Sequence, residues 1–173
     1  LMDTPDKGDG SLTGYNVWKW IDYDNYNYPY AGAGSPDFST NWIILRYAEI
    51  YLNDAEARLE TGDVEGARKA VNMIRQRVGL PDLTESDPEK LRELIRKERR
   101  IEFAFEEQRF YDVRRWKIGP ETQTTLHGVR FVSPTEFKVT KTDIRTWNDR
   151  LYLTPVPHDE IVRSSVLKQN PGY

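Results

Sequence analysis

The chain has 173 residues, with 25 lysines and arginines against 28 aspartates and glutamates, which gives a net charge of −3. This balance argues against nucleic acid as the main partner, because nucleic-acid-binding domains carry a strongly basic face. There is no cysteine and there are only two histidines, so we expect no disulfide, no thiolate chemistry, no metal and no cofactor. The length suits one core, and the absence of a long apolar run predicts a soluble chain.

The first predicted element, residues 1–43, is an aromatic-rich strand and loop. Residues 15–22 alternate between two faces as a strand does, and residues 24–36 are rich in Asn, Gly and Pro, as loops are. Flat rings with polar edges suit the apolar face and hydroxyl rim of a sugar. The candidate ligand residues are Trp18, Trp20, Tyr26, Tyr28 and Tyr30. The alternative is that these rings pack on the helices as part of the core.

Residues 44–118 form the predicted helical core, which opens with a helix pair. Apolar residues recur every three or four positions from Ile44 to Leu59, which predicts a helix with one buried face. Gly62 then suits the left-handed end of that helix, and Asp63 suits the N-cap of the next. The inward positions of the second helix are Ala67, Ala70, Val71, Ile74 and Val78. So short a connection predicts antiparallel neighbours resembling one tetratricopeptide unit.

A third helix has the clearest start in the chain. Residues 86–89, Ser-Asp-Pro-Glu, combine N-cap residues with a first-turn proline and a capping-box glutamate. The predicted apolar stripe is Leu91, Leu94, Ile95, Ile101 and Phe105. The helical pattern continues to Trp116, but about thirty uninterrupted residues exceed the usual globular length, so we expect a break near residues 106–109.

Residues 98–116 carry an ordered row of charged side chains. Glu98, Glu102, Glu106, Arg109, Asp112 and Trp116 fall within roughly a third of the helix circumference. Acid–base catalysis needs carboxyl groups whose pKa values are pushed apart, whereas arginines three or four positions away, such as Arg109 for Glu106, would keep these acids ionised. We therefore predict no catalytic residue and a structural charge network made of Glu98, Glu102, Glu106, Arg109, Asp112 and Arg115.

Residues 119–173 form the last predicted region. Gly119 and Pro120 end the helical stretch, and residues 127–140 have the alternation and β-branched content of short strands. Two prolines make residues 152–157 extended, and residues 159–161 begin a last helical turn. The predicted fold is mainly α, with long irregular loops and a few short strands.

Five blocks of this sequence resemble, in the same order, the C-terminal part of SusD/RagB proteins. The blocks are ILRYAEIYLNDAEARLETGD, VNMIRQRVGLP, LIRKERRIEFAFEEQRFYDVRRW, LYLTPVPHDEI and QNPGY. They span residues 44–173, and GYNVWKW resembles the block that commonly precedes them. Members of the family often carry glycine where Glu107 stands. SusD/RagB proteins are surface nutrient-binding lipoproteins of Bacteroidetes-type outer membranes and are several times longer, so the chain resembles their C-terminal portion.

The resemblance implies a tetratricopeptide-like scaffold that presents glycans, or sometimes peptides, to a SusC-like TonB-dependent transporter. It implies an outward-facing place on the outer membrane, reached only through a lipid anchor outside this sequence, and neither catalytic residues nor a cofactor. The matching blocks fall on the scaffold helices. The five candidate ligand residues therefore rest on the aromatic argument alone.

Two other functions stay open. A helical adaptor would use the aromatic segment as an interface with another protein, since aromatic residues are frequent binding hot spots. A glycoside hydrolase would use two of Asp22, Asp24 and Asp37, with carboxyl groups about 5 to 9 Å apart across a cleft. Nothing in the sequence demands that geometry.

Overall fold

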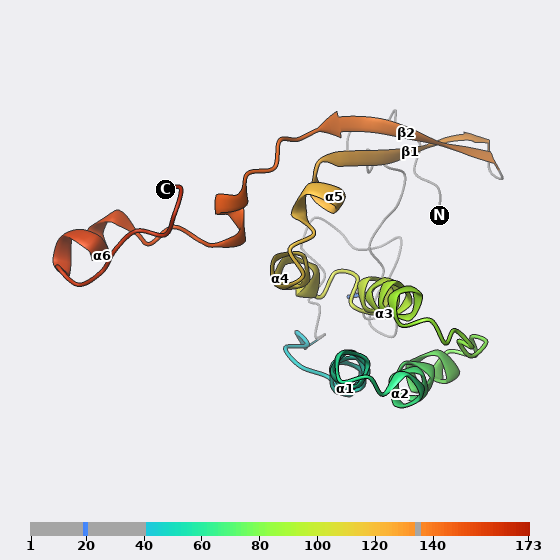
Figure 1. The fold of residues 1–173 in the computed structure, drawn as a ribbon. Helices are drawn as coiled ribbons and strands as arrows, with labels where there is room; N and C mark the ends of the chain where they lie inside the picture. The colour runs from blue at the N-terminus through green and yellow to red at the C-terminus, as the bar shows by residue number, and fades with distance from the viewer. Residues whose placement is uncertain (1–18, 21–40, 134–135) are drawn as a thin grey trace. The chain divides into compact units, whose positions relative to one another are not determined.

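The computed structural model describes residues 19–20, 41–133 and 136–173, and it is mainly α-helical (Figure 1). It divides into two compact units, of which one spans residues 19–109 and the other includes residues 110–173. Within the described ranges, no helix combines the length and the apolar character that crossing a membrane requires. The predicted domain boundaries near residues 44 and 119 stay predictions.

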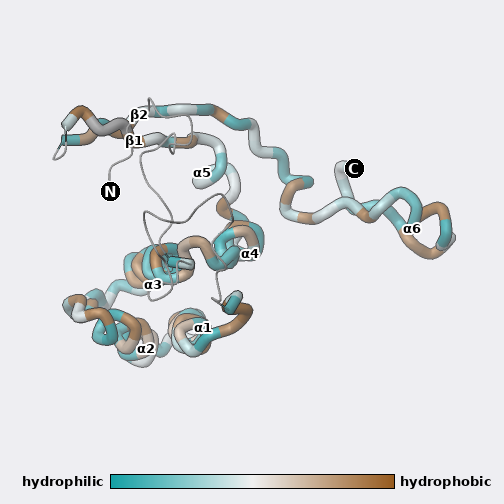
Figure 2. The backbone as a smooth tube through the Cα atoms, turned by 180° about the vertical axis from the view of Figure 1, so that it is seen from behind, coloured by the Kyte–Doolittle hydropathy of each residue, from teal (hydrophilic) through white to brown (hydrophobic). Residues whose placement is uncertain are grey.

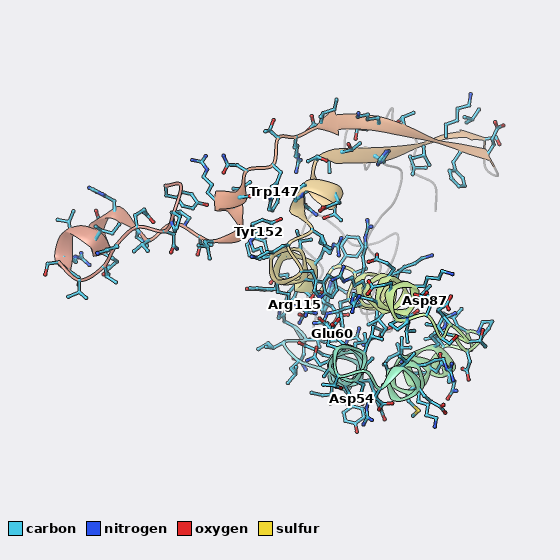
Figure 3. The ribbon with its side chains drawn as sticks, in the orientation of Figure 1. Asp54, Glu60, Asp87, Arg115, Trp147 and Tyr152 are labelled. Atoms are coloured by element: carbon cyan, nitrogen blue, oxygen red, sulfur yellow. The ribbon has the colours of Figure 1, made fainter. Side chains whose placement is uncertain are left out.

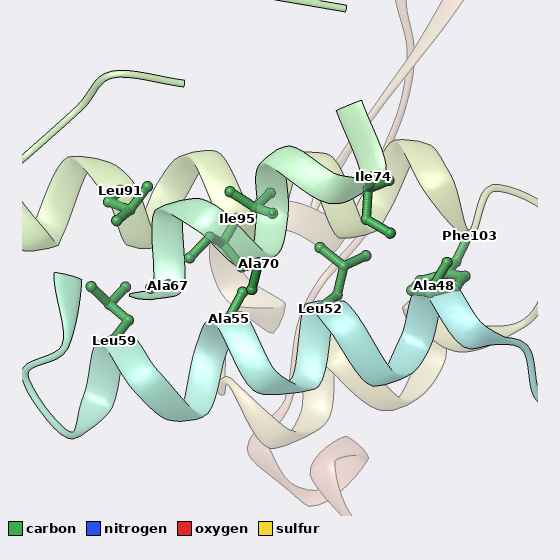
Figure 4. Close-up of a cluster of buried hydrophobic side chains, with 11 residues drawn as sticks. Ala48, Leu52, Ala55, Leu59, Ala67, Ala70, Ile74, Leu91, Ile95 and Phe103 are labelled. Atoms are coloured by element: carbon green, nitrogen blue, oxygen red, sulfur yellow. The ribbon is translucent and has the colours of Figure 1, made fainter. Parts of the chain in front are cut away.

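Three helices make up most of the unit that spans residues 19–109. They are α1 (Tyr47–Glu60), α2 (Val64–Arg77) and α3 (Pro88–Glu102), and each packs against the other two. Figure 4 shows α1 and α2 running in opposite directions with the alanines Ala55 and Ala70 facing each other. Small side chains at this contact let the two helices approach closely, as in the tetratricopeptide-like pair that the sequence predicts.

The hydrophobic core lies between these helices. Its buried residues are Ala48, Leu52, Ala55, Leu59, Ala67, Ala70, Val71, Ile74, Leu91, Ile95 and Phe103. Figure 2 shows apolar and polar residues alternating along α1, α2 and α3, as expected of helices that bury one face each.

Four predicted core positions are wrong, each at the end of a helix. Ile44 is exposed because α1 begins only at Tyr47, and Val78 is exposed because α2 has already ended. Ile101 and Phe105 are exposed, and Phe103 is buried in their place. The chain leaves helical geometry after Glu102, so the spacing that predicts Phe105 no longer applies there.

The predicted N-caps Asp63 and Asp87 are confirmed, but the capping box predicted with Glu89 is wrong. The backbone N–H of Asp87 donates to Glu85 at 2.9 Å, and Glu89 binds Arg92 instead. Asp63 accepts a hydrogen bond from the backbone N–H of Gly66 at 2.8 Å, and Asp87 accepts one from Lys90 at 3.0 Å. Each bond satisfies a backbone donor that a helix start leaves unpaired. Gly62 has φ +89°, a left-handed conformation that glycine adopts without steric cost.

A tight turn of residues 103–107 separates α3 from α4 (Gln108–Arg115). The predicted break is therefore real, but it begins three residues before the expected range of 106–109. Phe105 and Glu107 have φ of 63° and 64°, a region that residues with a Cβ rarely occupy. Glu107 thus holds a left-handed conformation that glycine would adopt at a lower steric cost.

The other unit contains a β-hairpin and short helices. After α5 (Gly119–Gln123), β1 (Thr125–Ser133) pairs with β2 (Glu136–Ile144) in an antiparallel sheet, with Val129 opposite Val139. The predicted strands are therefore confirmed and extend further than residues 127–140. A 3₁₀ helix (Asp149–Tyr152) and α6 (His158–Arg163) follow, with an extended segment between them.

Trp147 packs on the start of α5 in this unit. Its ring lies 5.0 Å from that of Tyr152, centroid to centroid (Figure 3), and a Cβ added at Gly119 would come within 2.2 Å of it. The backbone N–H of Gly119 also donates to the Tyr152 hydroxyl at 3.3 Å. Glycine is therefore required at this position for the indole to pack against the backbone.

We predict that Glu107→Gly raises the free energy of unfolding by roughly 0.5 to 1 kcal/mol, because glycine removes the steric cost of the left-handed conformation. Chemical denaturation measures the change. Glu107→Ala is the control, because alanine keeps the Cβ and should bring no gain. Equal effects of the two variants would contradict the prediction.

Candidate functional site

The described residues contain one of the five predicted ligand residues, Trp20. The other four, Trp18, Tyr26, Tyr28 and Tyr30, lie outside the described residues, as do the hydrolase candidates Asp22, Asp24 and Asp37. Their roles stay predictions. The geometry that follows concerns Trp20 and the residues around it in the unit that spans residues 19–109.

Trp20 stacks on Trp42, and the two form what we call the tryptophan pair. Their ring centroids are 4.6 Å apart and their planes differ by 14°. Trp42 is 53% exposed, and Trp20 is half-buried. The sequence prediction missed Trp42, because it precedes α1 and lies outside the dense aromatic run. The position of Trp42 just before an amphipathic helix is the one feature of the sequence that could have identified it.

Residues 19 and 20 are attached to the 103–107 turn by hydrogen bonds to backbone carbonyls. The indole N–H of Trp20 donates to the carbonyl of Phe105 at 3.2 Å. The Lys19 ammonium donates to the carbonyls of Glu102 and Ala104 at 3.0 and 3.1 Å. Three backbone carbonyls within residues 102–105 therefore accept hydrogen bonds from residues 19 and 20, which lie more than eighty residues earlier in the chain.

Arg46 joins the residues before α1 to the same stretch. Its guanidinium binds both carboxylate oxygens of Glu106, with Nε at 2.7 Å from Oε2 and Nη2 at 3.0 Å from Oε1. Nη1 binds the carboxylate of Glu102, and the guanidinium carbon lies 4.6 Å from the centre of the Phe103 ring. This bidentate geometry is specific to arginine and fixes the orientation of both partners.

Two glutamates of α3 also pair with arginines of α2. Glu98 binds Arg75 of α2 at 2.7 Å, and Glu102 binds Arg77 of α2 at 2.8 Å. The sequence spacing suggested partners within residues 98–116, such as Arg109 for Glu106. The structure brings in Arg46, Arg75 and Arg77 because this face of α3 is directed at the other two helices.

The predicted charge network is divided between the two compact units. Glu98, Glu102 and Glu106 belong to one unit, together with Arg109, which is half-buried and has an interaction of its own. Asp112 and Arg115 belong to the other, where they form an ion pair of 2.9 Å within α4. Asp112 is buried and has the local partner that the sequence spacing suggests.

The pairing around Glu106 keeps its carboxyl group ionised. Burial raises the pKa of Glu106, but the hydrogen bonds from Arg46 and Lys19 outweigh burial and hold the pKa below its ordinary value. For Arg46, burial lowers the pKa, and the bonds to Glu106 and Glu102 reverse that effect and raise it. A carboxylate held in this state is a poor proton donor near neutral pH.

The arrangement of the described residues therefore suits a binding surface better than a catalytic site. No group of three or more histidines, aspartates or glutamates in the described ranges is placed to hold a metal ion. The tryptophan pair presents a partly exposed aromatic surface attached to a rigid charged framework. Such a surface suits stacking against the flat apolar face of a ligand.

Comparison with known proteins gives consistent matches. A sequence model of the SusD family matches residues 2–173. SusD-like protein P2 of Formosa agariphila is 38% identical over 155 residues, covering 83% of this chain and 28% of that protein. SusD-like protein P25 of the same organism is 32% identical over 172 residues, covering 87% of this chain and 31% of that protein.

Solved structures agree. The crystal structure of a SusD-like protein from Bacteroides fragilis NCTC 9343 has 98% sequence identity and a TM-score of 0.87, and the match covers 100% of this chain and 33% of that one. The chain thus spans about a third of the length of the relatives that it matches.

We predict that Arg46→Ala lowers the free energy of unfolding by about 3 kcal/mol, because it takes the bidentate partner from a buried carboxylate. Thermal or chemical unfolding measures the loss. Arg58→Ala is the matched control, because Arg58 pairs with Asp54 and Asp63 but is 46% exposed. An exposed pair contributes less than about 1 kcal/mol, so equal losses would refute a buried role for Arg46.

We predict that Glu106 makes the stability dependent on pH in the acid range. Its pKa in the folded protein lies below its ordinary value of 4.5, so its stabilising effect is complete above that value. The effect is lost as the pH falls through the folded pKa, where the carboxylate takes up a proton. Unfolding curves below pH 4.5 should therefore show a smaller loss for Glu106→Gln than for the unchanged protein. Parallel losses in the two proteins would contradict the assignment.

Proposed function

Because the chain belongs to the SusD family, we propose that it takes part in the non-catalytic binding of glycans for nutrient uptake. Proteins of this family are in general glycan-binding proteins. We further propose that the protein works with a SusC-like TonB-dependent transporter at the outward face of the outer membrane, held there by a lipid anchor.

The observation that carries the binding proposal is the tryptophan pair. The ring of Trp42 is half-exposed and is supported from behind by Trp20 at 4.6 Å, so a ligand can stack on it without the ring having to be ordered first. A pyranose ring offers an apolar face of C–H groups, which suits an indole, and a rim of hydroxyl groups, which suits nearby polar atoms.

The expected affinity is modest. Each stacked ring contributes about 1 kcal/mol, so two or three rings and a few hydrogen bonds imply dissociation constants of roughly millimolar to micromolar. Weak binding at each ring is compatible with a polymeric ligand, because neighbouring sugar units can occupy several sites at once.

The pairing of Glu102 and Glu106 with arginine supports a non-catalytic role. Glu102 and Glu106 both pair with Arg46, which lies four residues after Trp42, and Glu102 also pairs with Arg77. A glycosidase needs one carboxylic acid that keeps its proton near neutral pH. A pKa of Glu106 held low by Arg46 and Lys19 is the opposite arrangement.

We predict that Trp42→Leu weakens binding of a soluble polysaccharide about fivefold to tenfold, as loss of one stacked ring should. Titration of the protein with a panel of soluble polysaccharides, followed by tryptophan fluorescence and calorimetry, measures the change. Trp42→Phe keeps a flat ring and should retain most of the affinity. Met73→Ala, an exposed apolar residue on α2, is the surface control.

Three outcomes would contradict the proposal. Equal affinities for Trp42→Leu and the unchanged protein would exclude the tryptophan pair as the binding surface. Absence of a saturable response to any polysaccharide would favour the adaptor alternative, for which the exposed side chains of Ile44, Leu45 and Tyr47 beside Trp42 offer an apolar protein interface. Release of reducing sugar by the purified protein would favour the hydrolase.

A further inference from the structure

The tryptophan pair is built from two segments that are far apart in the sequence, and both attach to the same short stretch of chain. Trp20 follows Lys19, whereas Trp42 lies four residues before Arg46. Lys19 and Arg46 both form ion pairs with Glu106. One carboxylate therefore binds the charged neighbour of each tryptophan.

The backbone of the same stretch repeats this convergence. The carbonyl of Glu102 accepts hydrogen bonds from both Lys19, at 3.0 Å, and Arg46, at 2.8 Å. The carbonyl of Phe105 accepts the indole N–H of Trp20 at 3.2 Å. Each segment is thus held by a carboxylate and by at least one carbonyl of residues 102–106.

The backbone conformation of the 103–107 turn allows these contacts, but it is sterically unfavourable. Phe105 and Glu107, on either side of Glu106, both have positive φ although neither is glycine. Such conformations persist only where the surrounding contacts over-determine them, and they cluster at functional positions. Here they set the direction of the carbonyls and of the Glu106 side chain, which is only 4% exposed.

We propose that Glu106 is a positioning residue, which holds Trp20 and Trp42 in their stacked, ligand-ready arrangement by binding Lys19 and Arg46 together. The proposal deepens the glycan-binding function and rests on it for its biological meaning. Its structural content, a stack that depends on Glu106, can be tested without any ligand.

A positioning residue is needed because stacking alone does not fix the relative orientation of two aromatic rings. Aromatic contacts of about 1 kcal/mol allow offset and tilted geometries of similar energy, so two chain segments joined only by the rings would sample many arrangements. A bidentate arginine–carboxylate pair is directional. By fixing both segments before the ligand arrives, Glu106 removes an ordering cost from binding.

The test uses Glu106→Gln, with Glu98→Gln as the matched control. Both glutamates are 7% exposed and bound by an arginine, but Glu98 pairs with Arg75 of α2, which belongs to neither segment of the tryptophan pair. Glutamine keeps the size of the side chain and removes the charge. Helix content and unfolding curves establish that both variants are folded.

Circular dichroism reads the stack directly, because two indoles in contact share their excited states and give paired bands of opposite sign. Loss of these bands in Trp42→Phe assigns them to the tryptophan pair. We expect Glu106→Gln to lose the paired bands and to bind polysaccharide about tenfold more weakly, while Glu98→Gln keeps both properties. Lys19→Met, which removes the charged contacts of the Trp20 segment and leaves those of Arg46 in place, should also lose the bands.

The outcomes separate the two proposals. Paired bands that persist in folded Glu106→Gln, or that vanish equally in Glu98→Gln, would overturn the positioning role and leave glycan binding untouched. Bands lost only in Glu106→Gln and Lys19→Met, in a protein that binds no polysaccharide, would support the positioning role and overturn the proposed function instead.

Discussion

The unit that spans residues 19–109 depends on one constraint, the need to neutralise the carboxylates that α3 and the 103–107 turn bring into the interior. Buried charge is costly unless it is paired and hydrogen-bonded. Arg46 meets this need for Glu102 and Glu106 together, with three hydrogen bonds from one guanidinium to the two carboxylates. A fourth goes to the backbone carbonyl of Glu102. Once that arginine is fixed, so is the path by which the chain enters α1. The directional bonds of the guanidinium thus define one geometry for this part of the chain.

The small residues at the contact between α1 and α2 are also needed for this pairing of charges. Close approach at Ala55 and Ala70 brings α2 near α1, and α3 packs on both helices. Arginines near the C-terminus of α2 then reach the glutamates of α3, as Arg75 reaches Glu98 and Arg77 reaches Glu102. Basic residues at a helix C-terminus also interact favourably with the helix dipole. The same arginines thus serve the end of their own helix and the charge balance of its neighbour.

Local features were predictable from the sequence, and long-range partners were not. Asp63 and Asp87 cap helices because a cap acts within three residues, and the strands followed from their alternation. Glu106 was assigned to Arg109 because that spacing is visible in the sequence, whereas Arg46, sixty residues away, becomes its partner only through packing. Phe105 was assigned to the core in place of Phe103 because an assumed helix phase fails where the helix stops. Of the tryptophan pair, the sequence indicates only Trp20, which belongs to a dense run of aromatic residues. Trp42 comes into contact with Trp20 only through folding.

In the sequence, the charged row and the aromatic segment are separate features, which predict a structural role for one and a binding role for the other. In the structure, Lys19 and Trp20 of the aromatic segment contact residues 102–106. The two kinds of interaction have complementary weaknesses. Ion pairs with arginine are directional but offer a ligand little apolar surface, whereas stacked rings offer that surface but tolerate sliding and tilting. A binding surface made of both obtains its geometry from the charges and its contact area from the rings. For the same reason, under the proposed function, Glu106 can strengthen binding without contacting the ligand.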